Sequence, residues 1–144
     1  MARILVADDE KSICQLLEIT FRKAGHAVET VTSGTAAKKK IESQACDLII
    51  ADIRMPDMSG IELLQHARAS HSNAAFILIT AVPTMPTAIE ALNLGAYRYV
   101  IKTDKLVDEI KVVVNRALEE MALHEENARL RREMLRIFAQ ENIV

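Results

Sequence analysis

Residues 4–9, Ile4-Leu5-Val6-Ala7-Asp8-Asp9, decide the fold of this chain, because a short apolar run ends directly in two aspartates. A second apolar run, Leu48-Ile49-Ile50-Ala51, ends in Asp52 in the same way. Apolar runs this short, separated by helical patterns, are typical of parallel strands that are buried on both faces. Ligands bind at the carboxyl ends of the strands in an open parallel sheet. We therefore predict that three carboxylates meet at one edge of such a sheet.

Three carboxylates at one edge repel each other unless a cation neutralises them. A hard divalent cation takes oxygen ligands, and Mg²⁺ commonly uses one or two carboxylates while it keeps several waters. The alternative is that Asp8 and Asp9 only cap the following helix, because aspartate is a preferred N-cap residue. Adding Asp52 favours the metal site, and we expect Mg²⁺ as the cofactor.

Apolar runs and helical patterns alternate five times along the chain. Strands are expected at residues 3–7, 27–31, 48–51, 75–79 and 97–101, and helices at 12–24, 35–43, 61–69 and 106–140. A further helix is expected to open at Pro86, with Thr87 as one possible N-cap, and to close at Gly95. In helix 12–24, the residues expected on one face are Ile13, Leu16, Leu17 and Thr20. The pattern predicts an α/β fold, a (βα)5 doubly wound parallel sheet with an extended C-terminal helix.

The C-terminal segment, from about residue 106 to 140, contains no glycine or proline and is too long to lie wholly on the sheet. Its first half carries enough apolar residues to cover one sheet face: Val107, Ile110, Val113, Val114 and Ala117. Its second half has a heptad pattern, the heptad seam, made of Leu123, Asn127, Leu130, Met134 and Ile137. An asparagine in such a seam often fixes the register of parallel two-stranded coiled coils, so we predict a homodimer through this helix. A seam through Met121, Ala128 and Leu135 is nearly as apolar, and a helix that is solvated or packed against a neighbouring part of the protein is the remaining alternative.

The bulk composition limits the function classes. The 144 residues suit one domain with an appendage, half of them are apolar, and the net charge is −2. These values give no sign of nucleic-acid or membrane binding. Cys14 and Cys46 lack a CxxC spacing and suggest a reducing environment, and residues 1–3 lead straight into a strand without a signal peptide. We therefore expect a cytoplasmic location.

Two further strand ends complete the predicted site. The fourth strand ends at Thr80 and the fifth at Lys102, so one edge presents three carboxylates, a hydroxyl and an ammonium. This combination suits phosphoryl transfer, because a carboxylate can attack phosphorus while a metal and a cation stabilise the phosphoryl oxygens. Asp52 is the expected nucleophile, since it stands alone at its strand end, and Asp8 and Asp9 are the expected metal holders.

The residues Asp8-Asp9-Glu10, the stretch 52–60 (Asp-Ile-Arg-Met-Pro-Asp-Met-Ser-Gly), Thr80-Ala81 and the stretch 99–102 (Tyr-Val-Ile-Lys) resemble the receiver domain of two-component response regulators, over about residues 2–120. The resemblance implies a flavodoxin-like fold and phosphorylation of Asp52 by a sensor histidine kinase. It also implies that Asp9 ligates Mg²⁺ directly and Asp8 largely through water, with Asp52 and the backbone carbonyl of Arg54 as further ligands. Thr80 and Tyr99 would move together as the switch, with Lys102 on the phosphoryl group.

The chain departs from the family at Thr103, where proline with a cis bond is usual. A non-proline cis bond costs about 2.5–4 kcal/mol, so either the Lys102–Thr103 bond is trans or a strained form persists. Residues 87–97 and 125–133 resemble the fourth helix and the linker helix of NtrC-type transcriptional activators, and residues 141–144 resemble the entry to their ATPase domain. We expect a receiver domain at 1–120 and a coiled-coil-like linker at 121–144, leading to a missing transcriptional output domain, with no direct nucleic-acid contact by this segment.

Three other classes compete with this interpretation. A phosphatase of the haloacid-dehalogenase type needs a second aspartate two residues after the nucleophile, where this chain has Arg54. A flavodoxin would need aromatic residues to stack a flavin, and the chain has no tryptophan. A degenerate receiver that serves only as a dimerisation module is the main alternative. In the favoured reading the domain catalyses its own phosphorylation and dephosphorylation, but it is regulatory rather than a metabolic enzyme.

Overall fold

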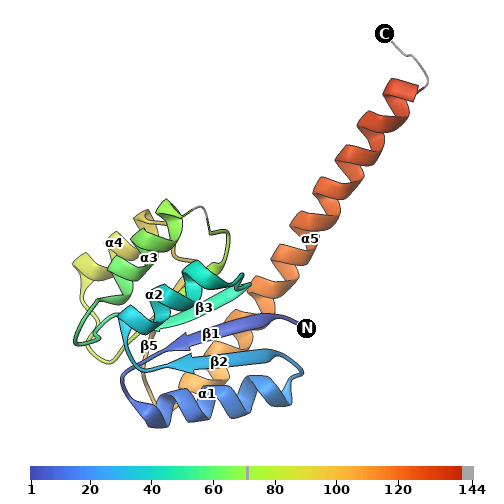
Figure 1. The fold of residues 1–144 in the computed structure, drawn as a ribbon. Coiled ribbons are helices and arrows are strands. Elements are labelled where there is room, and N and C mark those ends of the chain that lie inside the picture. Colours follow the sequence, from blue (N-terminus) through green and yellow to red (C-terminus); the bar gives the residue numbers. More distant parts are fainter. Residues whose placement is uncertain (71, 141–144) are drawn as a thin grey trace.

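The computed structural model describes residues 1–70 and 72–140. Within them, five parallel strands form one sheet in the order β2-β1-β3-β4-β5, and helices connect successive strands (Figure 1). The elements are β1 (Arg3–Ala7), α1 (Lys11–Lys23), β2 (Ala27–Val31), α2 (Gly34–Ser43), β3 (Leu48–Asp52), α3 (Gly60–Ala69), β4 (Ala75–Thr80), α4 (Met85–Asn93), β5 (Arg98–Ile101) and α5 (Leu106–Gln140). The predicted (βα)5 doubly wound parallel sheet is confirmed.

Helices cover both faces of the sheet, because successive strand residues point to opposite sides. Ile50 of β3 packs in one cluster with Leu17 of α1 and Ile110 of α5. Its neighbour Ile49 belongs to the cluster on the other face, with Leu64 of α3. Figure 1 shows α1 on one side of the sheet and α2, α3 and α4 on the other. The two clusters leave the carboxyl ends of the strands as the place where polar side chains gather.

Strand register brings the predicted carboxylates to one level. β1 and β3 are neighbours in the sheet, and Ala7 pairs with Ala51. The next residue on each strand is an aspartate, so Asp8 and Asp52 leave the sheet side by side. Asp52 is itself the last residue of β3, one residue beyond the predicted strand end.

Two local predictions are wrong. The buried face of α1 consists of Cys14, Leu17 and Phe21, whereas Leu16 is 45% exposed. Apolar residues lie on two adjacent faces of this helix, since Ile19 is also exposed, so periodicity could not select the buried one.

The second wrong prediction is the start of α4, which begins one residue before Pro86 and not at Pro86 itself. Its N-cap is Thr84, whose hydroxyl accepts the N–H of Thr87 at 3.3 Å. Thr87 is therefore the donor of the capping bond and not the cap. Proline is tolerated in the first helical turn, where its missing N–H has no intrahelical partner, so it marks the start of a helix only to within a residue or two.

The C-terminal helix α5 runs from Leu106 to Gln140, as predicted, and projects far beyond the sheet (Figure 1). Leu106, Ile110, Val114 and Ala117 are buried against the domain. The Lys102–Thr103 bond that precedes the helix is trans, which is the less strained of the two alternatives left open by the sequence. In the part of the chain that the structure describes, none of the helices is both long enough and apolar enough to cross a membrane.

Candidate functional site

Asp52 is held at the end of the central strand by a close backbone approach from α3. The residue is 5% exposed, and its Oδ1 accepts the N–H of Arg54 at 3.0 Å. A Cβ on Gly60, the first residue of α3, would lie 2.5 Å from the carbonyl oxygen of Asp52. Only glycine therefore lets α3 start so close to the strand. The glycine that ends the 52–60 motif thus positions the aspartate that opens it.

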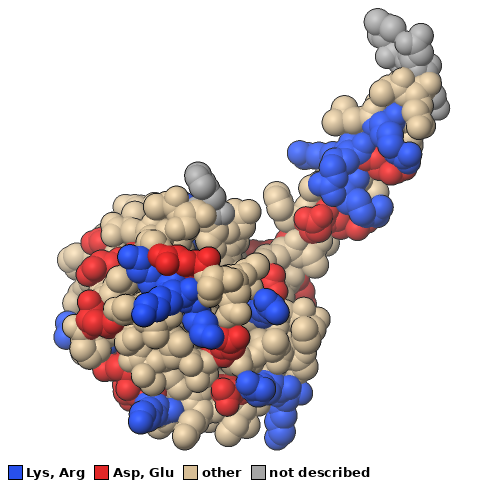
Figure 2. Space-filling model, viewed as in Figure 1, with Lys and Arg blue, Asp and Glu red and all other residues tan. Residues whose placement is uncertain are grey.

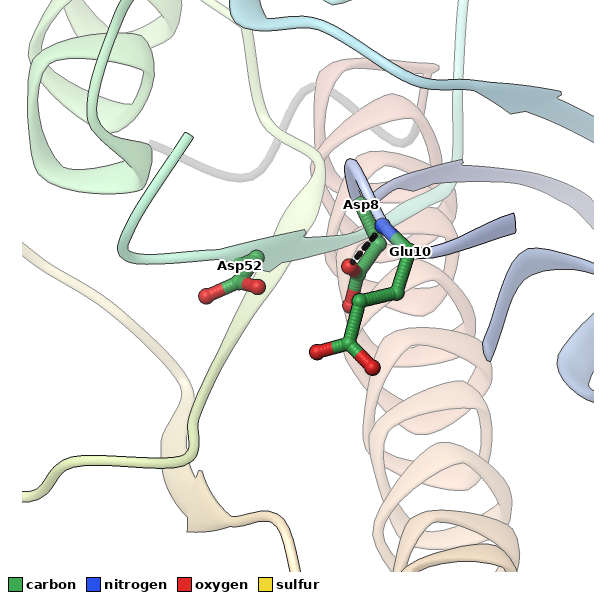
Figure 3. Close-up of side chains that lie close together, drawn as sticks. All are labelled: Asp8, Glu10 and Asp52. Carbon is green, nitrogen blue, oxygen red and sulfur yellow. Dashed lines mark hydrogen bonds between the residues drawn. The ribbon is translucent and has the colours of Figure 1, made fainter. Parts of the chain in front are cut away.

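Asp8 is fully buried in the turn between β1 and α1. Its Oδ1 accepts the N–H of Glu10 at 2.9 Å, and the free thiol of Cys14 donates to its backbone carbonyl at 3.2 Å. The N-cap of α1 is Glu10, which makes no side-chain capping bond. The carboxylate of Asp8 thus orders the turn and does not cap the helix at its second or third N–H. Figure 3 shows the carboxylates of Asp8, Glu10 and Asp52 gathered beyond the strand ends.

The ammonium of Lys102 joins these carboxylates. Its Nζ lies 2.8 Å from Asp8 Oδ2, 2.8 Å from Asp52 Oδ2 and 3.0 Å from Glu10 Oε1. The side chain of Lys102 is only 9% exposed, and its backbone N–H donates to the carbonyl of Thr80. Lys102 therefore reaches the site with a trans bond to the following residue. Three carboxylates around one ammonium leave two negative charges when all four groups are ionised.

The electrostatics of the cluster follow from this charge and from burial. Burial raises the pKa of Asp8 to about 6, and the charge of Asp52 adds to this, although the contact with Lys102 and the bond from the Glu10 N–H act in the opposite direction. Burial would lower the pKa of Lys102, but its close contacts with the carboxylates of Asp52, Asp8 and Glu10 outweigh burial and raise that pKa. The ammonium thus stays charged, and the carboxylates remain under-compensated.

The donor set fits Mg²⁺. One carboxylate oxygen from each of Asp8, Glu10 and Asp52 lies within 4.8 Å of the others, and a set made only of oxygens is what this ion prefers. Asp8 Oδ2 is buried, and within the described residues it meets the Lys102 ammonium as an ion pair but accepts no well-aligned hydrogen bond. A divalent cation would satisfy this oxygen and balance the two excess negative charges.

The structure brings together only part of the predicted metal set. Asp9 is exposed, and the acidic cluster of the described residues contains Glu10 in its place. Direct ligation by Asp9 and by the carbonyl of Arg54 stays a prediction. Sequence reasoning gave no role to Glu10, although its place in the acidic run that follows the first strand was the available signal.

The loop after Asp52 also ties down the neighbouring helix α2. The carboxylate of Asp57 accepts the backbone N–H groups of Gly34 and Thr35 and the hydroxyl of Thr35. These bonds, first of all the one from the Thr35 hydroxyl, lower the pKa of Asp57 to about 2. Negative charge at a helix N-terminus is favourable. These bonds tie the loop between Asp52 and α3 to the N-terminus of α2.

Of the two predicted switch residues, Thr80 adjoins the cluster through Lys102, whose N–H it accepts, and Tyr99 contacts α4. Thr80 is 1% exposed, and its hydroxyl accepts the N–H of Val82 at 3.1 Å. The hydroxyl of Tyr99, half-buried on β5, accepts the N–H of Thr84 at 3.3 Å and contacts the hydroxyl of Thr87 at 3.2 Å. Tyr99 thus holds the N-terminus of α4 in this conformation.

The heptad seam lies on the projecting part of α5. Its apolar members Leu123, Leu130, Met134 and Ile137 are 69%, 52%, 60% and 43% exposed. Asn127 is exposed as well. Residues 141–144, which resemble a domain entry in sequence, lie outside the described residues.

Comparison with known proteins agrees with this geometry. The model of the response regulator receiver domain matches residues 4–115. The regulatory protein AtoC of Escherichia coli K12 is 36% identical over 124 residues, which cover 86% of this chain and 27% of AtoC. The DNA-binding transcriptional regulator NtrC of Azospirillum brasilense is 34% identical over 117 residues, covering 81% of this chain and 24% of NtrC. The chain thus spans about a quarter of the length of these relatives.

Solved structures give the same result. The beryllofluoride-activated NtrC4 receiver domain dimer superposes with a TM-score of 0.77 at 30% identity, covering 83% of this chain and 98% of that one. A response regulator receiver domain protein from Clostridium thermocellum gives a TM-score of 0.76 at 29% identity, covering 85% and 98%.

Proposed function

The chain belongs to the response regulator receiver family and is similar to the receivers of NtrC-type regulators, and on that premise we propose that it is a phosphoacceptor switch centred on Asp52. The observation that carries the proposal is the placement of Asp52 at the end of the central strand, beside Lys102 and a buried acidic cluster that fits Mg²⁺. The donor of the phosphoryl group would be the phosphohistidine of a partner sensor kinase.

The transfer itself makes simple demands on the residues. A carboxylate oxygen of Asp52 attacks phosphorus, the P–N bond of the phosphohistidine breaks, and the ring nitrogen leaves with the electron pair and takes up a proton. Both oxygens of Asp52 have partners in this conformation, namely the N–H of Arg54 and the ammonium of Lys102. Lys102 must therefore move from Asp52 to a phosphoryl oxygen, which it can do without leaving the site.

We assign the metal to Asp8, Asp9, Asp52 and the backbone carbonyl of Arg54. The ion would supply positive charge that draws the attacking carboxylate and the phosphoryl oxygens together. Asp8 and Asp52 have the burial and spacing for this role. Asp9 would have to turn inward, and Glu10, already in the cluster, is its competitor for the position.

The switch would run from Thr80 through Tyr99 to α4. A phosphoryl group on Asp52 offers oxygens to the Thr80 hydroxyl, which in this conformation accepts a bond from a loop N–H. Movement of Thr80 toward them would open space for Tyr99 to turn inward and release its two contacts with α4. One new charged group would thereby shift the population between two packings.

The output would lie beyond this segment. Residues 1–120 would form the receiver and residues 121–144 a linker toward a transcriptional output domain, since the matched segment is only about a quarter of the length of the relatives. The linker would join two protomers through the heptad seam, and the receiver's state would alter that pairing. A cytoplasmic location fits a partner kinase that acts on a transcriptional regulator.

Intact mass after incubation with Mg²⁺ and a small acyl phosphate donor tests the proposal. We expect the wild type to gain one phosphoryl group, and Asp52→Asn, which keeps the size of the side chain, to gain none. Equal phosphoryl uptake by both proteins would show that a residue other than Asp52 is the acceptor. No uptake by a folded wild type that binds Mg²⁺ would favour the degenerate receiver that acts only as a dimerisation module.

A further inference from the structure

The projecting part of α5 presents an apolar stripe to solvent with charged residues on both flanks. This inference rests on the proposed dimerisation through the heptad seam. We propose that reciprocal ion pairs between Glu126 of one copy and Arg131 of the other hold the two helices parallel and in register. The Glu126–Arg131 pair selects both the partner and its orientation.

The exposure of the two candidate seams decides which one is available. The alternative seam starts at Met121, which is half-buried where α5 leaves the domain. Met121 lines a cavity of about 730 Å³ there, together with Tyr97 and Ala117. The domain thus covers the start of that seam, whereas Leu123, the first residue of the heptad seam, is 69% exposed. A second helix can therefore lie along the whole heptad seam without displacing the domain.

One arginine on this part of α5 lacks a partner on its own helix. Arg129, Arg132 and Arg136 pair with Glu126, Glu125 and Glu133. Figure 2 shows positive and negative side chains side by side on this part of the helix.

Arg131 has no carboxylate three or four residues away in either direction, and the described residues place no acid within ion-pair distance of it. It flanks the heptad seam, so its counter-charge would come from another molecule.

Heptad positions identify that counter-charge. With Asn127 and Met134 at position a, Glu126 falls at g and Arg131 at the following e. In a parallel in-register dimer, each g residue faces the next e residue of the other helix, so Glu126 faces Arg131 twice. Both carboxylate oxygens of Glu126 accept N–H groups of Arg129, and each oxygen keeps a second lone pair, so Glu126 can also accept from Arg131 of the second copy.

In an antiparallel dimer the same residues would make unfavourable contacts. There g faces g and e faces e, so Glu126 would face Glu133, and Arg131 would approach His124. In the antiparallel dimer Asn127 would also face Leu130, and its amide would have no hydrogen-bond partner. In the parallel dimer the two Asn127 side chains face each other and can hydrogen-bond. Charge and amide pairing thus both select the parallel dimer.

The test is sedimentation equilibrium of the 144-residue chain and its charge-reversal variants, with and without phosphoryl donor. Glu126→Arg and Arg131→Glu should each weaken dimerisation about tenfold, because two contacts per dimer change from attraction to repulsion. An equimolar mixture of the two variants should regain wild-type affinity, since both pairs are attractive again in the heterodimer. Glu133→Arg is the matched control, because it breaks a similar intrahelical pair with Arg136 but faces Phe138 of the second copy.

Three results would overturn the inference. Tighter dimerisation by Glu126→Arg would indicate the antiparallel arrangement. Equal weakening of dimerisation by Glu126→Arg and Glu133→Arg would show that Glu126 makes no ion pair with the second helix. A wild type that stays monomeric in both states would show that the seam serves a different partner or none. Phosphoryl uptake measured by mass on the same samples separates each of these results from failure of the phosphoacceptor proposal.

Discussion

Replacing Lys102 with methionine tests how the cluster is held together. The change keeps most of the buried side-chain volume but removes the ammonium that contacts Asp8, Asp52 and Glu10. Breaking a buried ion pair from one side costs about 3–5 kcal/mol. Glu10 is about half exposed and can turn toward water, so we expect the lower end, about 3 kcal/mol. For a chain of this size that loss lowers Tm by about 10 °C.

Thermal unfolding followed by circular dichroism measures the effect, with Lys105→Met as control because Lys105 is exposed and lies outside the cluster. Millimolar Mg²⁺ should raise the Tm of Lys102→Met more than that of the wild type. The variant has one more uncompensated negative charge and no ammonium in competition for the site. A Tm equal to that of Lys105→Met would show that the ammonium does not hold the carboxylates together. An equal Mg²⁺ shift in variant and wild type would show that Lys102 does not compete with the ion, and no shift in either protein would show that the carboxylates do not hold it.

Three further outcomes are expected. Gly60→Ala should destabilise the fold by about 1–3 kcal/mol in urea unfolding and lower phosphoryl uptake, because the added Cβ would lie 2.5 Å from the carbonyl oxygen of Asp52; unchanged stability would contradict the close approach. The carboxyl of Asp57 should titrate near pH 2 by NMR; since its folded-state pKa is depressed, its contribution to stability is full above about pH 4 and is lost as pH falls toward 2, and a normal midpoint would refute the loop contacts. Thr87→Val removes one contact of the Tyr99 hydroxyl and should move amide shifts of unphosphorylated α4 toward their phosphorylated positions; shifts that stay in place would show that the contact does not restrain the switch.

Much of the site follows from the sequence because its carboxylates are attached to strand ends. Short apolar runs locate the buried strands, and parallel pairing brings Asp8 and Asp52 to one edge. Glu10 was not predicted as a site residue because it lies in a loop. The direction of a loop side chain depends on the local backbone path, and hydrophobic periodicity carries no information about that path. The buried face of α1 was not predicted correctly because Leu16 is apolar and yet exposed. Two faces of the helix are therefore similarly apolar in sequence. Sequence patterns thus predict which residues lie at the ends of regular strands. They do not predict which of two similar faces is buried or where a loop side chain points.

The length of α5 gives small changes at the site a large effect at the seam. The helix starts four residues after Lys102, and its first turns are buried on the sheet up to Ala117. From Ala117 to Gln140 a helix extends about 35 Å at 1.5 Å per residue. A tilt of about 5° at the base would then displace the far end by about 3 Å, which is a large fraction of the 5.4 Å helical pitch. A seam of fewer than three heptads is a weak dimer contact, so a displacement of this size is enough to favour or oppose pairing. A short seam on a long helix is therefore suited to a signal, because a stronger seam would hold the dimer whatever the state of the receiver.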